Sequence, residues 1–106
     1  MSDEQWIHVA ELAELAADDV TAVHVAGREI AVYRVGAELY ATDAQCTHGN
    51  ARLCDGFLEG HEIECPLHQG RFDVRDGRPA CAPASVALRC HPIRLEEGRV
   101  YVRIGA

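Results

Sequence analysis

The chain has 106 residues and a formal net charge of −7, because 17 acidic residues outnumber ten arginines and lysine is absent. This length fits a single domain, residues 1–106, that buries about 60–65% of the surface its unfolded chain exposes. A large substrate pocket is not expected at this size. The acidic balance argues against nucleic acid and anionic membranes as partners and favours a partner with a basic face.

The longest apolar runs are short and interrupted by charge, and residues 1–4 are acidic rather than basic. We therefore expect neither a membrane span nor a secretory or transit peptide, and the cytoplasm is the expected location. A monomer is the default expectation for the oligomeric state.

Alternation of apolar and polar residues predicts an all-β domain with almost no helix. Val100, Val102 and Ile104 alternate with polar residues and predict a last strand with one buried face, joined by a turn at 97–98 to a strand in which Ile93 and Leu95 alternate with charges. The expected elements in chain order are a strand 6–9, a helical turn or two within 10–17, a meander of strands 20–26, 29–35 and 38–42 with turns at 27–28 and 36–37, short strands 61–64 and 71–74, and the final hairpin.

The composition changes between about residues 43 and 83. Glycines, prolines and four of the five cysteines collect there, and the clear alternation is lost. This predicts a small subdomain inserted into an antiparallel β framework, with loops that hold a site on a rigid sheet.

Two short patterns of metal ligands lie in this segment, Cys46-Thr47-His48 and Cys65-Pro66-Leu67-His68. Thiolates favour iron–sulfur clusters, zinc and copper(I), and imidazole accepts zinc, copper and iron. A Cys-x-His gap is shorter than those usual in zinc fingers, and the second pattern pairs Cys with His. The order suits a [2Fe–2S] cluster in which one iron takes two thiolates and the other two imidazoles. We predict Cys46, His48, Cys65 and His68 as the ligands.

These patterns and their flanks resemble the Rieske family along the whole chain. The similar segments are Cys46-Thr47-His48-Gly49, the run from Cys65 to Phe72, Tyr40-Ala41-Thr42-Asp43, Asp55-Gly56, Leu58-Glu59-Gly60 and Cys81-Ala82-Pro83. The resemblance is greatest to the ferredoxin component of ring-hydroxylating dioxygenases of the naphthalene type. It implies a Rieske fold, one [2Fe–2S] cluster and a carrier of single electrons from a flavin-dependent ferredoxin reductase to a terminal oxygenase, rather than an enzyme.

The family comparison also bears on the reduction potential. High-potential Rieske proteins of cytochrome bc complexes carry a serine and a tyrosine that bond to cluster sulfur, and in this chain Gly70 and Phe72 stand there. They also tie their loops with a disulfide at the positions of Ala51 and Leu67. Losing hydroxyl donors lowers the potential, so we expect a value near the low end of the Rieske range, about −150 mV.

The remaining cysteines and histidines carry no predicted chemistry. Cys54, Cys81 and Cys90 are expected to be reduced and mostly buried, with Cys81 packing near the cluster. The other histidines, His8, His24, His61 and His91, are expected to be solvated or in the core.

The resemblance places His48 and His68 at an exposed tip, where the electron would enter and leave. Pro66, Leu67 and Pro83 are expected to join them in the apolar centre of a docking surface. Acidic side chains such as Asp55, Glu59 and Glu64 are candidates for steering a basic partner, although the simpler interpretation of Asp55, Glu59, Glu62 and Glu64 is a solvated loop.

Two alternatives remain open. The first alternative to an electron carrier is a small Rieske subunit of another oxidoreductase, such as nitrite reductase. The second is a structural zinc module that acts by binding a partner. Neither a general base nor a nucleophile nor an iron triad of two histidines and a carboxylate can be identified in the sequence.

Overall fold

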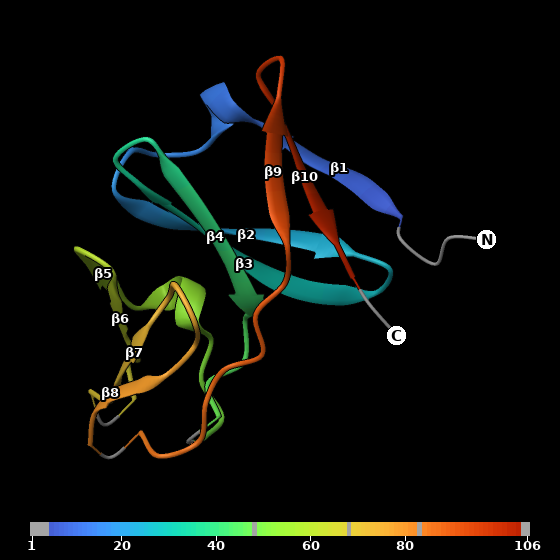
Figure 1. Ribbon diagram of the computed structural model, residues 1–106. Helices are drawn as coiled ribbons and strands as arrows, with labels where there is room; N and C mark the ends of the chain where they lie inside the picture. The colour runs from blue at the N-terminus through green and yellow to red at the C-terminus, as the bar shows by residue number, and fades with distance from the viewer. Residues whose placement is uncertain (1–4, 48, 68, 83, 105–106) are drawn as a thin grey trace.

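The computed structural model describes residues 5–47, 49–67, 69–82 and 84–104. Within these residues the regular structure is β-strand apart from two single turns of 3-10 helix, so the expected all-β class is confirmed. The strands form three antiparallel sheets. Figure 1 shows two of these sheets packed together and the third extending from them.

The first two sheets make the framework. One contains β1 (Trp6–Glu11), β10 (Arg99–Arg103) and β9 (Ile93–Glu96) in that order, and the other contains β2 (Asp19–Val25), β3 (Arg28–Val35) and β4 (Glu38–Asp43). Alternate residues of β10 and β3 meet between the sheets, where Val100, Val102 and Ile30 are fully buried. Burial of this apolar surface is the main contribution to the stability of the framework.

The predicted meander is confirmed, with one turn displaced by a residue. Val25 pairs with Arg28, so the first turn consists of Ala26 and Gly27 rather than 27–28, and both have positive φ (52° and 77°). Two positive φ angles define a type I′ turn, whose twist matches that of the flanking strands. Arg28 is therefore the first residue of β3 rather than part of the turn, and its side chain contacts Asp43.

Three smaller differences concern the ends of the chain. The expected helical turn is confined to a 3-10 turn at Leu12–Glu14, because β1 continues through Glu11. The final hairpin turns at 97–98 as expected, but Leu95 is 45% exposed and Ile104 lies beyond β10, half-buried. β9 is an edge strand paired with β10 alone, and three of its four residues are exposed.

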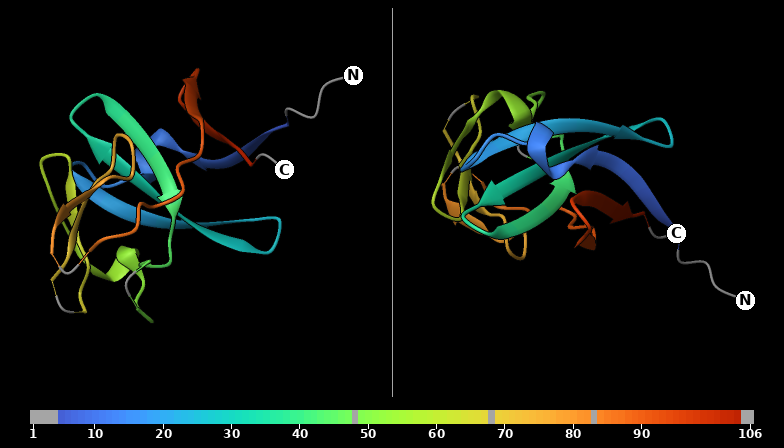
Figure 2. Two further views of the ribbon diagram at one scale, coloured as in Figure 1. Left: turned by 60° about the horizontal axis from the view of Figure 1, so that its bottom comes forward. Right: turned by 90° about the horizontal axis from the view of Figure 1, so that it is seen from above.

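The third sheet is the inserted part of the chain. It contains β5 (Phe57–Glu59), β6 (Glu62–Glu64), β7 (Arg71–Asp73) and β8 (Pro79–Cys81), and a 3-10 turn at Leu53–Asp55 precedes it. The sequence predicted β6 and β7 but missed β5 and β8. Figure 2 shows this sheet at one end of the molecule and both termini at the other, so the site is remote from the chain ends.

Candidate metal centre

The first predicted cysteine lies in a tight loop after β4. The backbone N–H of Cys46 donates to the carbonyl of Ala51 at 2.9 Å, and that of Leu53 donates to Ala44 at 2.7 Å. These bonds cross the base of the loop, and Leu53 is completely buried beneath it. The backbone of Cys46 is therefore fixed independently of any metal.

The second predicted cysteine follows β6. Its backbone N–H donates to the carbonyl of Gly70 at 2.8 Å, which closes a loop of the same kind. Pro66 has no N–H to place in this loop. The N–H of Leu67 donates to the Cys65 thiol, a contact that favours the thiolate and offsets part of the rise in pKa that burial causes. An amide that donates to a ligand sulfur is one of the contacts that set the potential of an iron–sulfur cluster.

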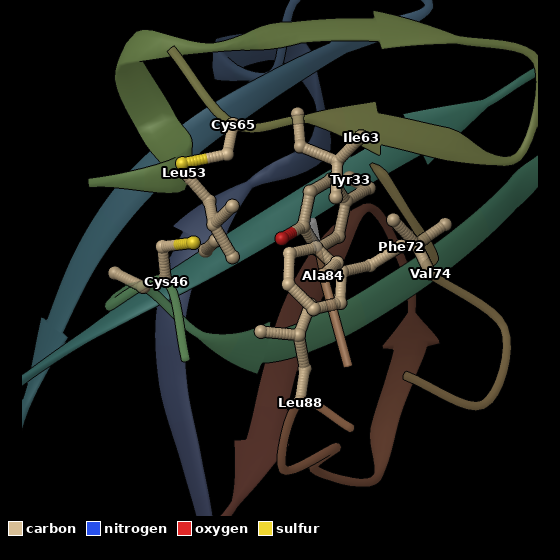
Figure 3. Close-up of a cluster of buried hydrophobic side chains, with 11 residues drawn as sticks. Tyr33, Cys46, Leu53, Ile63, Cys65, Phe72, Val74, Ala84 and Leu88 are labelled. Carbon is tan, nitrogen blue, oxygen red and sulfur yellow. The ribbon is translucent and has the colours of Figure 1, made fainter. Parts of the chain in front are cut away.

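The two thiols lie together in a second hydrophobic core, which also contains Tyr33 of β3 and Phe72 of β7. Cys46 and Cys65 are both buried, and Figure 3 shows their sulfur atoms on the same side of this core, beside Leu53. Burial, and to a smaller extent a hydrogen bond with the Cys46 thiol, raises the pKa of Cys65 to about 11. Both thiols must lose a proton to bind iron, so cluster assembly releases protons.

Three loops pack against one another around these cysteines. A Cβ atom on Gly49 would lie 3.2 Å from Cδ2 of Leu67, and one on Gly70 would lie 3.0 Å from the backbone nitrogen of Ala84. Thr47, between the first two predicted ligands, donates its hydroxyl to the carbonyl of Val86 at 2.6 Å. Ala84 and Val86, in the loop after β8, thus lie against the two ligand loops. The sequence did not predict this contact, because the partners of Thr47 and Gly70 are remote in sequence.

The two predicted histidine ligands, His48 and His68, lie outside the described residues, as does Pro83. Among the described residues no three His, Cys, Asp or Glu side chains come close enough to hold a metal ion. The cysteine half of the predicted set does come together, since two adjacent buried sulfurs suit one iron with two thiolate ligands. The residues present therefore fit a [2Fe–2S] cluster.

A groove of about 640 Å³ runs beside the two ligand loops. Small side chains and the second loop supply its apolar lining, and Arg52, which also lines it, contacts Glu29 and Asp55. The lining residues are Glu29, Ala44, Gln45, Asn50, Ala51, Arg52, Asp55, Pro66 and Leu67.

The other three cysteines are less buried than the sequence predicted. Cys54, Cys81 and Cys90 carry no disulfide, but Cys81 and Cys90 are exposed and Cys54 is half-buried. The expectation of burial was therefore wrong for two of the three. Burial raises the pKa of Cys54 to about 11, which keeps this thiol protonated at neutral pH.

Each remaining histidine contacts a carboxylate. His8 meets Glu11 at 2.7 Å, His24 meets Glu29 at 3.5 Å, and His61 meets Glu38 at 3.3 Å, all with the imidazole at least a third exposed. His91 differs because it is buried and lies 2.7 Å from Asp43.

The acidic residues near the ligand loops are ion-paired rather than simply solvated. Arg71 contacts Glu59, Glu62 and Glu64 at 3.0, 3.4 and 2.9 Å. Arg52 contacts both oxygens of Asp55 at 3.1 and 3.2 Å and also holds Glu29. Three carboxylates face one guanidinium around Arg71, so this surface remains acidic.

Comparison with known proteins agrees with this geometry. The chain matches the Rieske [2Fe-2S] domain family over residues 5–92. It is 54% identical to the ferredoxin component of the naphthalene 1,2-dioxygenase system of Pseudomonas aeruginosa over 99 residues, which cover 93% of this chain and 95% of that one. It is 44% identical to the anthranilate 1,2-dioxygenase ferredoxin subunit of Burkholderia cepacia over 102 residues, 95% of this chain and 94% of that one.

Among solved structures, the fold is similar to a chain in a complex of reduced oxygenase and oxidised ferredoxin of carbazole 1,9a-dioxygenase. The TM-score is 0.88 with 41% identity, and the match covers 92% of each chain.

A small antiparallel β framework that carries two cysteine–histidine loops defines a class, and the chain belongs to the Rieske [2Fe-2S] family, with one [2Fe–2S] cluster as its cofactor. Within that class it is a ferredoxin component of an aromatic ring-hydroxylating dioxygenase system, an electron carrier rather than the oxygenase itself. No helix in the described part of the chain is long and apolar enough to cross a membrane.

Proposed function

We propose that Cys46, His48, Cys65 and His68 hold the cluster, with the two thiolates on one iron and the two imidazoles on the other. The observation that carries this proposal is the pair of buried, adjacent thiols at the base of two closed loops. When bound, the cluster accepts and returns one electron. The protein's part is to fix the sulfur ligands, exclude water from them and leave the histidine side of the site open to a partner.

We further propose that the potential lies near the low end of the Rieske range, about −150 mV. Phe72 is fully buried beside the cysteines and offers no hydroxyl. The hydroxyl of Tyr33 is buried in the core around the cysteines and lies 2.8 Å from Oγ1 of Thr42, which is also buried. Thr42 donates its own hydrogen to the carbonyl of Asp43, so Tyr33 must donate to Thr42 and has no hydrogen for cluster sulfur.

The partners in this proposal are a flavin-dependent ferredoxin reductase as donor and a terminal oxygenase as acceptor. The similar carbazole dioxygenase ferredoxin is found in a complex with its oxygenase, which supports the second assignment. A transient electron-transfer contact is expected to be small, below about 1,200 Å². Pro66 and Leu67 are exposed beside the groove and supply apolar surface for it.

The test is a reconstitution with a purified flavin reductase and a purified terminal oxygenase of a naphthalene-type system. We expect NADH to reduce the oxygenase through the wild-type protein, and Cys65→Ser to abolish this transfer while Cys54→Ser supports it. Reduction of the protein by the reductase without onward transfer would contradict the assignment of an oxygenase as acceptor. Stable co-purification with a different large catalytic chain would instead favour a subunit of another oxidoreductase.

A further inference from the structure

The segment that carries the cluster loops joins the framework through two lengths of chain that lie side by side. One is the end of β4, residues 41–43, which leads into the first ligand loop, and the other is residues 89–91, which lead back to β9. We call these two lengths the neck. Figure 1 shows β4 entering this region and the chain returning beside it to β9.

Backbone hydrogen bonds pair the two sides of the neck. Thr42 and Cys90 form an antiparallel bridge, the N–H of Asp43 donates to Arg89 at 2.9 Å, and the N–H of His91 donates to Ala41 at 2.9 Å. This short ladder has no neighbouring strand on the exit side, so side-chain contacts matter more here than within a sheet.

One side-chain contact crosses the neck, between a buried histidine and a carboxylate that is 33% exposed. Nε2 of His91 lies 2.7 Å from Oδ1 of Asp43, and the histidine side chain is 2% exposed. A carboxylate can only accept, so the imidazole donates. Arg28, at the start of β3, approaches the same oxygen at 3.1 Å, so Asp43 joins the exit segment to two strands of the framework.

Asp43 is also coupled to the ligand loop that follows it. Its carbonyl accepts from the hydroxyl of Thr42 at 2.8 Å, and the next residue, Ala44, bonds to Glu29 and Leu53. Cys46 comes three residues after Asp43, within this chain of fixed contacts. A shift of Asp43 therefore displaces the loop that contains Cys46.

We propose that His91, acting through Asp43, is a positioning residue for the first cluster-binding loop. In this role His91 joins the exit of the inserted segment to its entrance and thereby keeps Cys46 correctly placed relative to Cys65. This inference rests on the proposed function insofar as Cys46 is taken as a ligand.

The chain offers a matched control. His8 and Glu11 also make an imidazole–carboxylate contact of 2.7 Å, but on β1, with both side chains close to half exposed. The same substitution at His8 removes an equivalent contact from a strand that carries no ligand loop. A change seen at His91 and absent at His8 is therefore due to the place of the contact rather than to its chemistry.

The test compares wild type, His91→Phe, His91→Gln, Asp43→Asn, the double variant His91→Phe/Asp43→Asn, and His8→Phe, each as purified holoprotein. The rate of cluster loss in excess iron chelator is followed by visible absorbance, and electron paramagnetic resonance of the reduced protein reports the ligand geometry. The midpoint of urea unfolding, followed by far-ultraviolet circular dichroism, controls for general destabilisation.

We expect His91→Phe to lose its cluster about tenfold faster than wild type and to give broadened resonance lines, because a charge-assisted bond is lost. His91→Gln keeps a donor and should restore most of both properties, and His8→Phe should match wild type in both. In the double variant the loss should be no faster than in the more affected single variant, since both substitutions break one contact.

Wild-type rates and line widths in His91→Phe, or effects of the two single substitutions that multiply in the double variant, would overturn the proposal. If His91→Phe does not accumulate as folded holoprotein, Asp43→Asn decides by the same criteria. A wild-type protein without a Rieske spectrum would instead refute the ligand set, which separates failure of the proposed function from failure of this inference.

Discussion

At the scale of single residues, burial separates the two cysteines assigned to the cluster from the other three. Cys46 and Cys65 are 2% and 1% exposed, whereas Cys81 and Cys90 are exposed and Cys54 is half-buried. Their thiols lie close enough to form a hydrogen bond with each other, and no disulfide joins them, which is the arrangement expected of two thiolate ligands to one iron. The spacing of the motifs and the packing of the side chains thus lead independently to the same pair.

Replacing one of these sulfurs should remove the cluster. We expect Cys65→Ser to be purified with little iron or sulfide, because a serine oxygen is a poor ligand for this cluster and the loop has no substitute. Cys81→Ser, the matched control on the exposed end of β8, should keep two irons and two sulfides per chain. Metal and sulfide analysis is the measurement, and loss of the cluster from Cys81→Ser would show that the ligand set is incomplete.

Hydroxyl groups near the cysteines give a second residue-scale prediction. Phe72→Tyr places a hydroxyl beside the cluster and should raise the midpoint potential, since a donor to cluster sulfur stabilises the reduced form. Tyr33→Phe is the control, because Tyr33 donates to Thr42. It should leave the potential unchanged and cost about 1 kcal/mol of stability.

Potentials from spectroelectrochemical titration and unfolding midpoints in urea test this pair. A lower potential in Tyr33→Phe would mean that its hydroxyl does reach the cluster.

What could be predicted for single residues depended on sequence distance. The four ligands could be predicted from the sequence because each Cys–His pair lies within four residues, so one motif holds the whole signal. The role proposed for His91 could not be predicted, because its partner Asp43 is 48 residues away and a lone histidine has many possible environments. The same holds for Thr47 and its acceptor Val86, which are 39 residues apart.

At the scale of elements, alternation predicted the framework strands and failed for the sheet that carries the site. β3 and β10 have enough residues for a buried face to repeat, whereas all four strands of the sheet that carries the site have three residues, too few to show a period. β6 and β7 were predicted from their places next to the ligand loops rather than from alternation, and β5 and β8 have no such marker. The pairing of β5 with β6 also requires a close approach at its start, since a Cβ atom on Gly56 would lie 2.0 Å from the carbonyl oxygen of Glu64. Such a requirement depends on the partner strand and leaves no pattern in the local sequence.

The hairpin of β7 and β8 depends on one carboxylate. Asp73 is nearly buried, accepts from the guanidinium and the backbone N–H of Arg75, and lies 3.4 Å from Arg78. The bond from Arg75 holds the pKa of Asp73 well below its usual value of 3.8. Because the folded pKa lies below the unfolded one, the stabilisation is fully present above about pH 4 and is lost as pH falls further.

We therefore expect Asp73→Asn to lower the free energy of unfolding by about 2 kcal/mol, the range for a hydrogen bond to a charged group. The deficit should stay constant between pH 8 and 5, where the carboxylate is ionised in both states. Urea unfolding midpoints of the holoprotein across this range are the measurement. A deficit that changed within it would contradict the direction of the shift in pKa.

At the scale of the whole molecule, the end that carries the ligand loops also carries an acidic surface. The termini lie at one end and the ligand loops at the other, with the acidic group around Arg71 on the sheet beside them. An acidic surface next to the site raises the rate of encounter with a basic partner, and salt screens this effect.

We expect the bimolecular rate of electron transfer to the oxygenase to fall several-fold between about 0.01 and 0.15 M ionic strength, where the screening length shortens from about 30 to 8 Å. Glu59→Gln should reduce this salt dependence, because Glu59 is largely exposed and lies in the acidic group. Glu97→Gln, on the turn between β9 and β10, is the control. Stopped-flow reduction provides the rates, and equal slopes against salt for both variants would exclude steering by this surface.

The measurement that tests the central claim most directly is low-temperature electron paramagnetic resonance of the dithionite-reduced protein, purified without oxygen, together with iron and sulfide analysis. The account predicts a rhombic signal whose average g value lies clearly below that of an all-cysteine [2Fe–2S] ferredoxin, with two irons and two sulfides per chain. A silent sample that contains zinc and no sulfide would contradict it and would identify a structural metal module instead.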